Sequence, residues 1–469
     1  MRVFVNRTRE LAELAAAWDG GGAHLRLLCG RRRVGKTYLL QHFLSDDRPH
    51  CYFLASAMTI GGNLQRLAQA VIDLHPTRSN LTPADVPTLP AILALYEDIA
   101  VERRCALVLD EFQYLVDADP SIPSQLQAWW DASGIHSRAF VVLCGSHIGM
   151  MEALAQGGGP LYGRFTARTR LQPMAYHDAV LFYGDSNWSV RDKLTSYGVL
   201  GGTPKYHAVF STSNSLESNI AWHILSPDGL MHDESEALIS SSSVRDLAPY
   251  NSILQAVAEG ETRRGQIEQS AGVTSSQFAY CAQTLMELGW IERQKPFGED
   301  SAKRSIYAIT DHFINFCHRF VLPLAGALEF RSADEVYAAR VGPYMSDYMG
   351  RYVFEDICVQ YLRRQAANRH GLAVERAGRY WSRDGSVEID IVGDLEGDGT
   401  LACECKWSSS PIGVGVYYDL MHKVSLLPPP RNSRHTRYML FSAAGFDDRM
   451  KEAAGSDGVI LVSGEDLLP

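Results

Sequence analysis

Nearly continuous apolar runs alternate with helical patterns over the first 175 residues of this 469-residue chain. Three of these runs are short: Leu25–Cys29, Cys105–Leu109 and Phe140–Cys144. Runs of this kind are typical of strands that are buried on both faces of a parallel sheet. Because amphipathic helical patterns separate them, residues 1–175 are predicted to form an α/β domain with a doubly wound parallel sheet.

The pattern of predicted helices and strands changes twice in the remaining chain. Residues 176–245 have a helical pattern interrupted by glycines and predict a small helical lid. Residues 246–330 predict a winged helix-turn-helix. Its expected elements are the helices Asn251–Ala258, Arg264–Ser270 and Thr274–Leu288 and the strands Trp290–Arg293 and Ser305–Ile309. Residues 331–469 mix helix and strand and are predicted to form a separate α/β domain.

Composition narrows the class of protein. Hydrophobic residues make up 46% and charged residues 21%, which is ordinary for a globular protein. No apolar run reaches the length of a membrane span, Met1–Phe4 does not begin a signal peptide, and nine scattered cysteines suit a reducing cytoplasm. We therefore expect a cytoplasmic protein without a membrane partner. A net charge of −10 argues against general coating of nucleic acid.

The most informative segment is Gly30–Thr37, Gly-Arg-Arg-Arg-Val-Gly-Lys-Thr, which fits the phosphate-binding pattern G-x-x-x-x-G-K-[ST]. It lies between a predicted strand and a predicted helix, where backbone N–H groups and the helix N-terminus can surround a phosphate. Lys36 is expected to reach the β- and γ-phosphates of ATP and Thr37 to hold Mg²⁺. The full expected nucleotide-binding set is Gly30, Arg31, Arg32, Arg33, Val34, Gly35, Lys36, Thr37 and Tyr38.

Two further strand ends carry candidate chemistry. Asp110 and Glu111 follow the second apolar run, where a carboxylate is expected beside the Mg²⁺ of a nucleotide. Asp110 is assigned to the metal, and Glu111 to the orientation and deprotonation of the attacking water. Ser146 follows the third run and is the candidate sensor of the γ-phosphate or the water. A structural turn is the alternative interpretation for Ser146.

A second constellation lies near the C-terminal end. Asp390 falls in the alternating run Val387–Val392, and Glu404 and Lys406 fall in Leu401–Trp407 with the spacing E-x-K. On adjacent antiparallel strands, Asp390 and Glu404 can share a divalent metal, Mg²⁺ or Mn²⁺, beside Lys406. Glu355 on an upstream helix is a further candidate ligand. The alternative is an ordinary cross-strand ion pair.

Six arginines between residues 361 and 383 strengthen the nucleic-acid interpretation, although a solvated basic helix face is the alternative. They are Arg363, Arg364, Arg369, Arg376, Arg379 and Arg383. Cys403 and Cys405 flank Glu404 and are expected to be core residues. Lys295, Lys303 and Arg304 in the loop of the predicted wing are candidate phosphate contacts, with a packing role as the alternative.

The residues carry a family resemblance. The chain resembles the archaeal-type ATPases, a STAND/AAA+-like branch of the P-loop ATPases. The segments that resemble them are Phe4-x-Asn6-Arg7-x-x-Glu10-Leu11, Gly30–Thr37, Leu109–Gln113, Leu161–Arg164 and Gly201-Gly202-Thr203-Pro204-x-Tyr206. The C-terminal part is similar to PD-(D/E)xK restriction-endonuclease-like domains, with Glu355, Asp390, Glu404 and Lys406 on the motif.

The resemblance implies a function in outline. Arg164 looks like the arginine of the family that acts as a finger toward a γ-phosphate, in cis or in trans, so a homo-oligomer stays an option. The alternative for Arg164 is a structural arginine that caps a helix or pairs with an acid. The leading interpretation is an ATPase coupled to a metal-dependent DNA nuclease. DNA would be bound by the C-terminal domain, with the winged helix as an additional candidate. The alternatives are a nucleotide-dependent switch with a nuclease-like domain that only binds a partner, and an interaction scaffold.

Overall fold

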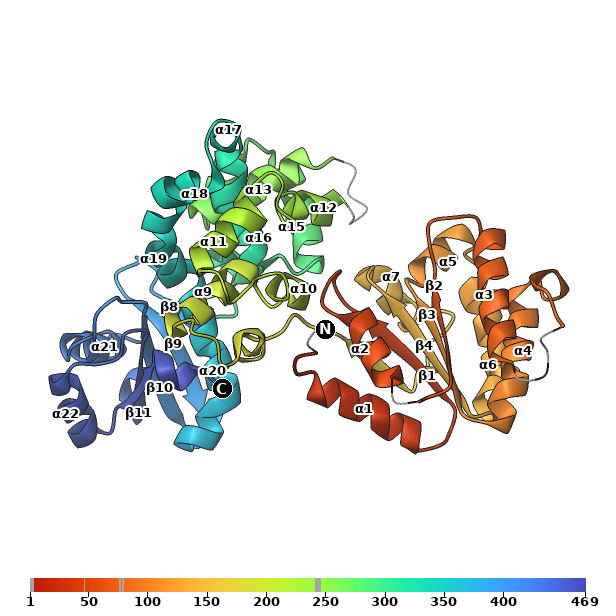
Figure 1. The fold of residues 1–469 in the computed structure, drawn as a ribbon. Helices are drawn as coiled ribbons and strands as arrows, with labels where there is room; N and C mark the ends of the chain where they lie inside the picture. The colour runs from red at the N-terminus through yellow and green to blue at the C-terminus, as the bar shows by residue number, and fades with distance from the viewer. Residues whose placement is uncertain (1–3, 46, 76, 78–79, 241–245) are drawn as a thin grey trace. The chain divides into compact units, whose positions relative to one another are not determined.

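The fold was analysed in a computed structural model that describes all residues except 1–3, 46, 76, 78–79 and 241–245. The start of the chain and the predicted lid boundary at residue 245 therefore lie outside the described residues. Two compact units are present, residues 1–173 and residues 174–469, and each is described by itself (Figure 1).

The first unit is built on a five-stranded parallel sheet with the order β2-β3-β4-β1-β5. Its strands are β1 (His24–Cys29), β2 (His50–Leu54), β3 (Cys105–Asp110), β4 (Ala139–Gly145) and β5 (Ala167–Arg170). All six positions of β3 and all seven of β4 are buried, as their apolar sequence requires of central strands. The predicted α/β class with a parallel sheet is confirmed.

Helices cover both faces of this sheet (Figure 1). On one face, α1 (Thr8–Asp19) and α2 (Lys36–Leu44) enclose a core that includes Leu14, Leu40 and Phe140. On the other face pack α3 (Ile60–Leu74), α4 (Leu89–Glu102), α5 (Gln113–Ala118), α6 (Ile122–Ala132) and α7 (Ile148–Ala153). The carboxyl ends of β1, β3 and β4 consequently meet at one edge, where the candidate residues lie.

The second unit begins with short helices, of which α8 (Tyr176–Ala179) and α9 (Val190–Leu200) are the first. Then follow α13 (Ala248–Glu259), α14 (Arg264–Ala271) and α15 (Ser275–Glu287), and the antiparallel pair β6 (Ile291–Gln294) and β7 (Ile306–Ile309). These are the three helices and two strands that the sequence predicts there, and they enclose a small apolar core of their own.

The C-terminal part of this unit is a mixed five-stranded sheet with the order β12-β11-β10-β9-β8. Strands β8 (Val374–Trp381), β9 (Glu388–Leu395) and β10 (Gly399–Lys406) are antiparallel neighbours, whereas β11 (Thr436–Ser442) and β12 (Ile460–Ser463) run parallel to β10. The helices of this part are α20 (Phe354–His370), α21 (Gly415–Ser425) and α22 (Asp448–Asp457).

One apolar core joins elements that are far apart in the sequence of the second unit. It contains Leu200 of α9, Phe316 of α16 (His312–Phe316), Ile357 of α20, and Cys403 and Phe441 of the C-terminal sheet. Cys403 and Cys405 are both buried, which confirms that they are core residues. Because one face of the sheet packs into this core, the sheet and the helices that precede it share one apolar core.

In the described part of the chain, no helix combines the length and apolar character needed to cross a membrane.

Candidate nucleotide site and C-terminal carboxylate site

The loop between β1 and α2 has a backbone that only particular residues permit. Gly30 has φ 158° and Gly35 has φ 96°, and Gly35 caps the N-terminus of α2 without any side-chain hydrogen bond. A Cβ atom on Gly30 would lie 2.5 Å from the carbonyl oxygen of Leu171. Both glycines are therefore required by the loop, which leaves the helix N-terminus open toward an anion.

Lys36 and Thr37 begin α2 and turn back toward the strand ends. The buried Lys36 ammonium donates hydrogen bonds of 2.8 Å to Gly30 O and 2.9 Å to Arg31 O, so it closes the loop on itself. The Thr37 hydroxyl donates a 2.8 Å hydrogen bond to Asp110 Oδ2. The lysine and threonine of the motif are thus both held at the bottom of the loop.

Asp110 at the end of β3 is fully buried, and its carboxylate accepts three hydrogen bonds. Besides Thr37, the Tyr52 hydroxyl of β2 donates to Oδ2 at 2.5 Å and the Glu111 backbone N–H donates to Oδ1 at 2.9 Å. Burial and the negative charge of Asp110 hold the pKa of Tyr52 far above its usual range, so the phenol stays a donor.

These residues fit a bound nucleotide and its metal. The open helix N-terminus and the Lys36 ammonium suit phosphate oxygens, and the adjacent Thr37 hydroxyl and Asp110 carboxylate are the oxygen donors that Mg²⁺ prefers. When bound, Mg²⁺ neutralises charge on the β- and γ-phosphates.

Glu111 and Ser146, two of the predicted site residues, lie in direct contact. Ser146 Oγ donates a 2.9 Å hydrogen bond to Glu111 Oε2, and the Gln113 amide contacts both of them, at 3.2 Å from Ser146 Oγ. Glu111 has φ 53°, a left-handed conformation that costs a non-glycine residue energy and is concentrated at functional sites. A Cβ atom on Gly145 would lie 2.6 Å from Gln113 Oε1, so Gly145 makes room for this amide.

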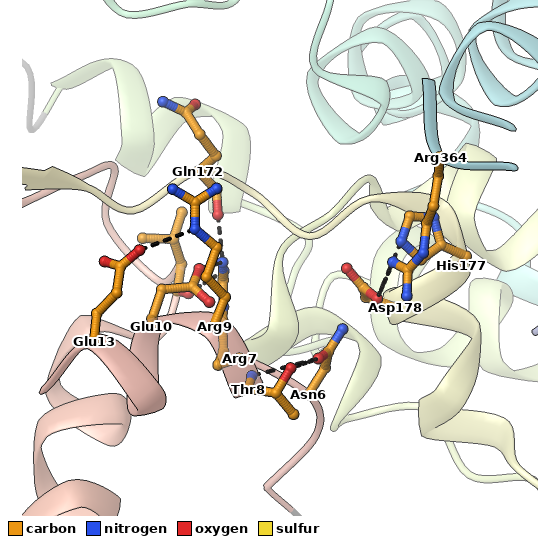
Figure 2. A network of polar contacts seen from close by, with 11 residues as sticks. Asn6, Arg7, Thr8, Arg9, Glu10, Glu13, Gln172, His177, Asp178 and Arg364 are labelled. Carbon is orange, nitrogen blue, oxygen red and sulfur yellow. Dashed lines mark hydrogen bonds and ion pairs between the residues drawn. The ribbon is translucent and has the colours of Figure 1, made fainter. Parts of the chain in front are cut away.

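An N-terminal arginine holds the loop from outside (Figure 2). Arg7 Nη2 donates to the backbone oxygens of Val34 at 3.1 Å and Gln172 at 2.8 Å, while Nη1 pairs with Glu10 at 3.0 Å. Asn6 and Arg7 both have positive φ, 54° and 60°. This strained turn directs the guanidinium onto the loop and explains why the opening motif accompanies the phosphate-binding sequence.

The other predicted loop residues are spread around the loop. Arg32 Nη2 lies 3.4 Å from the Tyr114 hydroxyl, and Arg33 has φ 68°. Val34 is buried in the core of the α2 face, whereas the Tyr38 ring packs 5.5 Å from Phe4. Val34 therefore anchors the loop through its side chain.

Arg164, the predicted finger, lies in an ion pair within the first unit. Its Nε and Nη2 donate to Asp131 Oδ1 and Oδ2 of α6 at 2.8 and 2.7 Å, and Nη1 donates to Tyr162 O at 2.9 Å. The structural alternative for this arginine therefore has a specific partner.

In the C-terminal sheet, Glu404 and Lys406 project to the same side, as expected. Lys406 Nζ lies 2.7 Å from Glu404 Oε1, and Lys423 of α21 lies 3.0 and 3.1 Å from the two oxygens of Glu404. Asp390 Oδ2 of the neighbouring strand accepts a 2.7 Å hydrogen bond from Cys405 N. Burial and the nearby Glu404 raise the pKa of Asp390. The four side chains thus form one coupled group.

Glu355 on α20 belongs to the same neighbourhood. Burial raises its pKa to about 8, and Asp390 and Glu388 add to the shift against the opposing charge of Arg379. The Arg379 guanidinium lies 3.8 Å from Glu355 and also pairs with Glu388. No set of three or more His, Cys, Asp or Glu side chains among the described residues is arranged to hold a metal ion. Arg379 pairs with Glu355 and Glu388, and Lys406 and Lys423 pair with Glu404.

Most of the arginines predicted to form a basic patch have partners inside the second unit. Arg364 donates to Asp178 at 3.0 Å (Figure 2), and Arg369 donates to Asp466 O at 2.8 Å. Arg376 pairs with Asp394 at 2.5 Å, and Arg379 is held as described above. These arginines, which the sequence predicts to contact a phosphate backbone, thus bind acidic side chains and a backbone oxygen of the same unit.

The β6–β7 hairpin loop, residues 295–305, packs on the edge strand β8. Phe297 N donates to Arg379 O at 2.8 Å, and Arg304 Nη1 donates to Trp381 O at 3.1 Å. The guanidinium groups of Arg376 and Arg431 lie 5.6 and 4.8 Å from the centre of the Phe297 ring. Arg304 is therefore used in packing, the alternative considered for this loop.

Three residues of these sites are not among the predicted site residues: Tyr52, Gln113 and Lys423. The sequence predicts Arg379 only as part of a basic patch, not as a partner of the carboxylates. Gln113 stands two positions after Glu111 in Leu109–Gln113, so that segment carried the only signal. The others reach the sites through tertiary packing.

Together, the parallel sheet, the glycine loop and the Lys36–Thr37–Asp110 arrangement define a P-loop ATPase domain. Residues 4–209 match a family model described as an ATPase domain predominantly from archaea. This part of the chain is a Walker-type ATPase domain that binds ATP. Residues 317–414 match a second model, described as archaeal and bacterial proteins of unknown function.

Individual relatives agree with this assignment. An uncharacterized protein of Methanocaldococcus jannaschii is 26% identical over 409 residues, which cover 86% of this chain and 88% of that protein. An uncharacterized ATP-binding protein of the same organism is 48% identical over 46 residues, 10% of this chain and 78% of its own length. A Walker-type ATPase of Pyrococcus abyssi has a similar fold, with a TM-score of 0.51 at 20% identity over 67% of this chain and 96% of its own.

Proposed function

We propose that this protein hydrolyses ATP, with Glu111 as the group that orients and deprotonates the attacking water. The observation that carries the proposal is the position of Glu111, one residue after the Asp110 that contacts Thr37, in a strained backbone conformation and in contact with Ser146 and Gln113. An acid held in this way stands beside the expected γ-phosphate, where a general base must lie.

The test is phosphate release by the purified chain. Glu111→Gln should keep ATP binding but lower the turnover rate by about a hundredfold or more, the usual contribution of a general base. Lys36→Ala should lose binding itself. Glu102→Gln, an exposed acid at the end of α4, is the matched control and should behave as the wild type. Undiminished turnover in Glu111→Gln would refute the assignment.

The C-terminal domain is proposed to be a metal-dependent nuclease acting on DNA. The supporting observation is the grouping of Asp390, Glu404 and Lys406, with Glu355 nearby and the pKa of both Asp390 and Glu355 raised. Carboxylates crowded in this way gain stability when a cation joins them. Mg²⁺ or Mn²⁺ would supply Lewis acidity there, and Lys406 would stabilise the charge that grows on a scissile phosphate.

A nucleotide-dependent switch is the second candidate, because one observation favours it. Arg379, Lys406 and Lys423 already neutralise the carboxylates, so the domain is stable without metal and can serve only to bind a partner. In this case ATP would control the binding of that partner.

One assay separates the two candidates. Linear, branched and single-stranded DNA would be incubated with the protein and Mg²⁺ or Mn²⁺, with and without ATP. Cleavage that disappears in Asp390→Asn but persists in Asp448→Asn, an exposed control on α22, supports the nuclease. Cleavage that persists in Asp390→Asn removes the site assignment, and absence of cleavage in the wild type favours the switch.

A further inference from the structure

A pocket lies beside β5 on the face of the first sheet that carries α7, and we call it the β5 pocket. Its volume is about 310 Å³, at the lower end of the range of small-molecule sites. Leu27 and Cys29 of β1 form its floor, and Arg168 and Arg170 of β5 form one side. The strand register places Arg168 beside Leu27 and Arg170 beside Cys29, so all four side chains project to the same face. The pocket contains none of the residues expected to bind the nucleotide.

The opposite wall of the β5 pocket is the end of α7. Glu152 belongs to the last turn of this helix, and Ala155 and Gln156 follow in the turn after it. Because β5 is the edge strand of the sheet, the pocket lies at the margin of the first unit's core. A ligand that entered it would contact a strand on one side and a helix end on the other.

The floor of the β5 pocket is apolar and uncharged. Leu27, Cys29 and Ala155 are each only 2% exposed and belong to the apolar core on this face. Burial raises the pKa of the Cys29 thiol, so this side chain stays neutral and behaves as a small apolar group. The part of a ligand that rests on this floor must therefore be apolar as well.

The rim, in contrast, has an excess of positive charge. Arg170 pairs with Glu152 at 3.5 Å. Within the part of the chain that the structure describes, no hydrogen bond or ion pair holds the exposed Arg168 guanidinium. Two guanidinium groups thus share one carboxylate, and one positive charge has no counter-ion. Charged side chains protect edge strands from pairing with other chains, but that role does not require an apolar pocket beside them.

We propose that the β5 pocket binds a small organic anion. The apolar part of the ligand lies on Leu27, Cys29 and Ala155, and its anionic group accepts hydrogen bonds from Arg168. A carboxylate, sulfonate or phosphate group matches the planar fork of a guanidinium. The site is separate from the nucleotide site, and the inference depends neither on ATP hydrolysis nor on DNA cleavage.

The test uses two fluorescent probes that differ by one anionic group. Anilinonaphthalene sulfonate joins a sulfonate to an apolar ring system, and phenylnaphthylamine has the same ring system without the sulfonate. Each probe is titrated into the full chain in EDTA with saturating ATP, so that the nucleotide site is filled. Anilinonaphthalene sulfonate should bind saturably and about tenfold more tightly than phenylnaphthylamine, because only the sulfonate accepts charged hydrogen bonds.

Three variants locate the binding. Arg168→Met should lower the affinity for anilinonaphthalene sulfonate about tenfold and leave the affinity for phenylnaphthylamine unchanged. Gln156→Trp places a large ring at the rim and should weaken the binding of both probes. Arg9→Met replaces an arginine of α1 whose side chain is 88% exposed, and this matched control should bind both probes as the wild type does. Circular dichroism and thermal unfolding establish that folded proteins are compared.

Each contrary result overturns a defined part of the proposal. Equal affinities for the two probes, or an unchanged sulfonate affinity in Arg168→Met, overturn the anion contact. Absence of saturable binding, binding seen only without ATP, or binding that Gln156→Trp leaves unchanged overturns the site. Bound anilinonaphthalene sulfonate should also slow amide hydrogen exchange in β5 and in residues 152–156, and protection confined to other segments overturns the location.

Discussion

The Thr37 hydroxyl donates a 2.8 Å hydrogen bond to Asp110 Oδ2, joining the first turn of α2 to the end of β3 across 73 positions of sequence. This contact connects the two motifs from which the ATPase assignment was made. The nucleotide site therefore depends on the sheet that places β1 and β3 close together.

The metal requirement of ATP hydrolysis should follow from that contact. Thr37→Ala removes one oxygen donor and should raise the Mg²⁺ concentration needed for half-maximal hydrolysis by about tenfold, since a lost hydroxyl contact to a charged group costs roughly 1.5 kcal/mol. Thr37→Ser keeps the hydroxyl and should retain the wild-type requirement. The measurement is phosphate release as a function of Mg²⁺, and equal midpoints for Thr37→Ala and Thr37→Ser would contradict the role of the hydroxyl.

Arg7 should control nucleotide affinity without contacting the chemistry. Arg7→Lys cannot maintain the forked contacts to Val34 O, Gln172 O and Glu10, so the loop loses its outer support. We expect ATP affinity to fall about tenfold, measured by titration with a fluorescent ATP analogue. Turnover at saturating ATP should change less than affinity. Arg9→Lys is the control, because Arg9 is exposed and pairs with Glu13 of α1 (Figure 2).

Acid should destabilise the second unit through a buried histidine. Burial lowers the pKa of His207 to about 4, and its ring is enclosed between Tyr183 and Gly201. Between these two pKa values the unfolded chain, with a histidine pKa of about 6.5, binds a proton at this residue, whereas the folded chain keeps His207 neutral. The contribution of neutral His207 to the free energy of unfolding is therefore fully present above about pH 6.5. It declines as the pH falls toward 4, by up to about 1.4 kcal/mol per pH unit for this group.

The check is urea unfolding between pH 7.5 and 5. His207→Gln should lose part of the pH dependence of the free energy of unfolding, whatever its stability at neutral pH. The exposed His422 serves as control, and His422→Gln should keep the wild-type slope. A slope that is the same in all three proteins would remove His207 as the cause.

The hairpin loop should depend on Phe297 for its position on β8. Phe297→Ala removes the ring between Arg376 and Arg431, which should destabilise the packed loop by about 1–2 kcal/mol. Amide hydrogen exchange of residues 295–305 and of β8 should accelerate, whereas exchange in β10 should not. Tyr280→Ala replaces an exposed aromatic of α15 and is the control. Unchanged exchange in the loop would show that the backbone contacts hold it alone.

Much of the nucleotide-binding half could be predicted from local sequence pattern. Buried parallel strands read as continuous apolar runs, and a phosphate loop needs glycines and a lysine at fixed spacing, so Gly30–Thr37 and Asp110 could be located from local pattern. The same holds for Glu404 and Lys406, because alternate residues of a strand share a face.

The partners of these residues, in contrast, depend on how the chain folds in three dimensions. Tyr52 reaches Asp110 through strand pairing, Arg7 reaches the loop from the turn that precedes α1, and Lys423 reaches Glu404 from α21. The tertiary structure also decided that Arg376 and Arg379 face acids within the fold. Long-range contacts of this kind depend on how elements pack in three dimensions, and local spacing carries no record of them. The burial that sets the pKa of Glu355 and Asp390 likewise arises only when α20 and the C-terminal sheet come together.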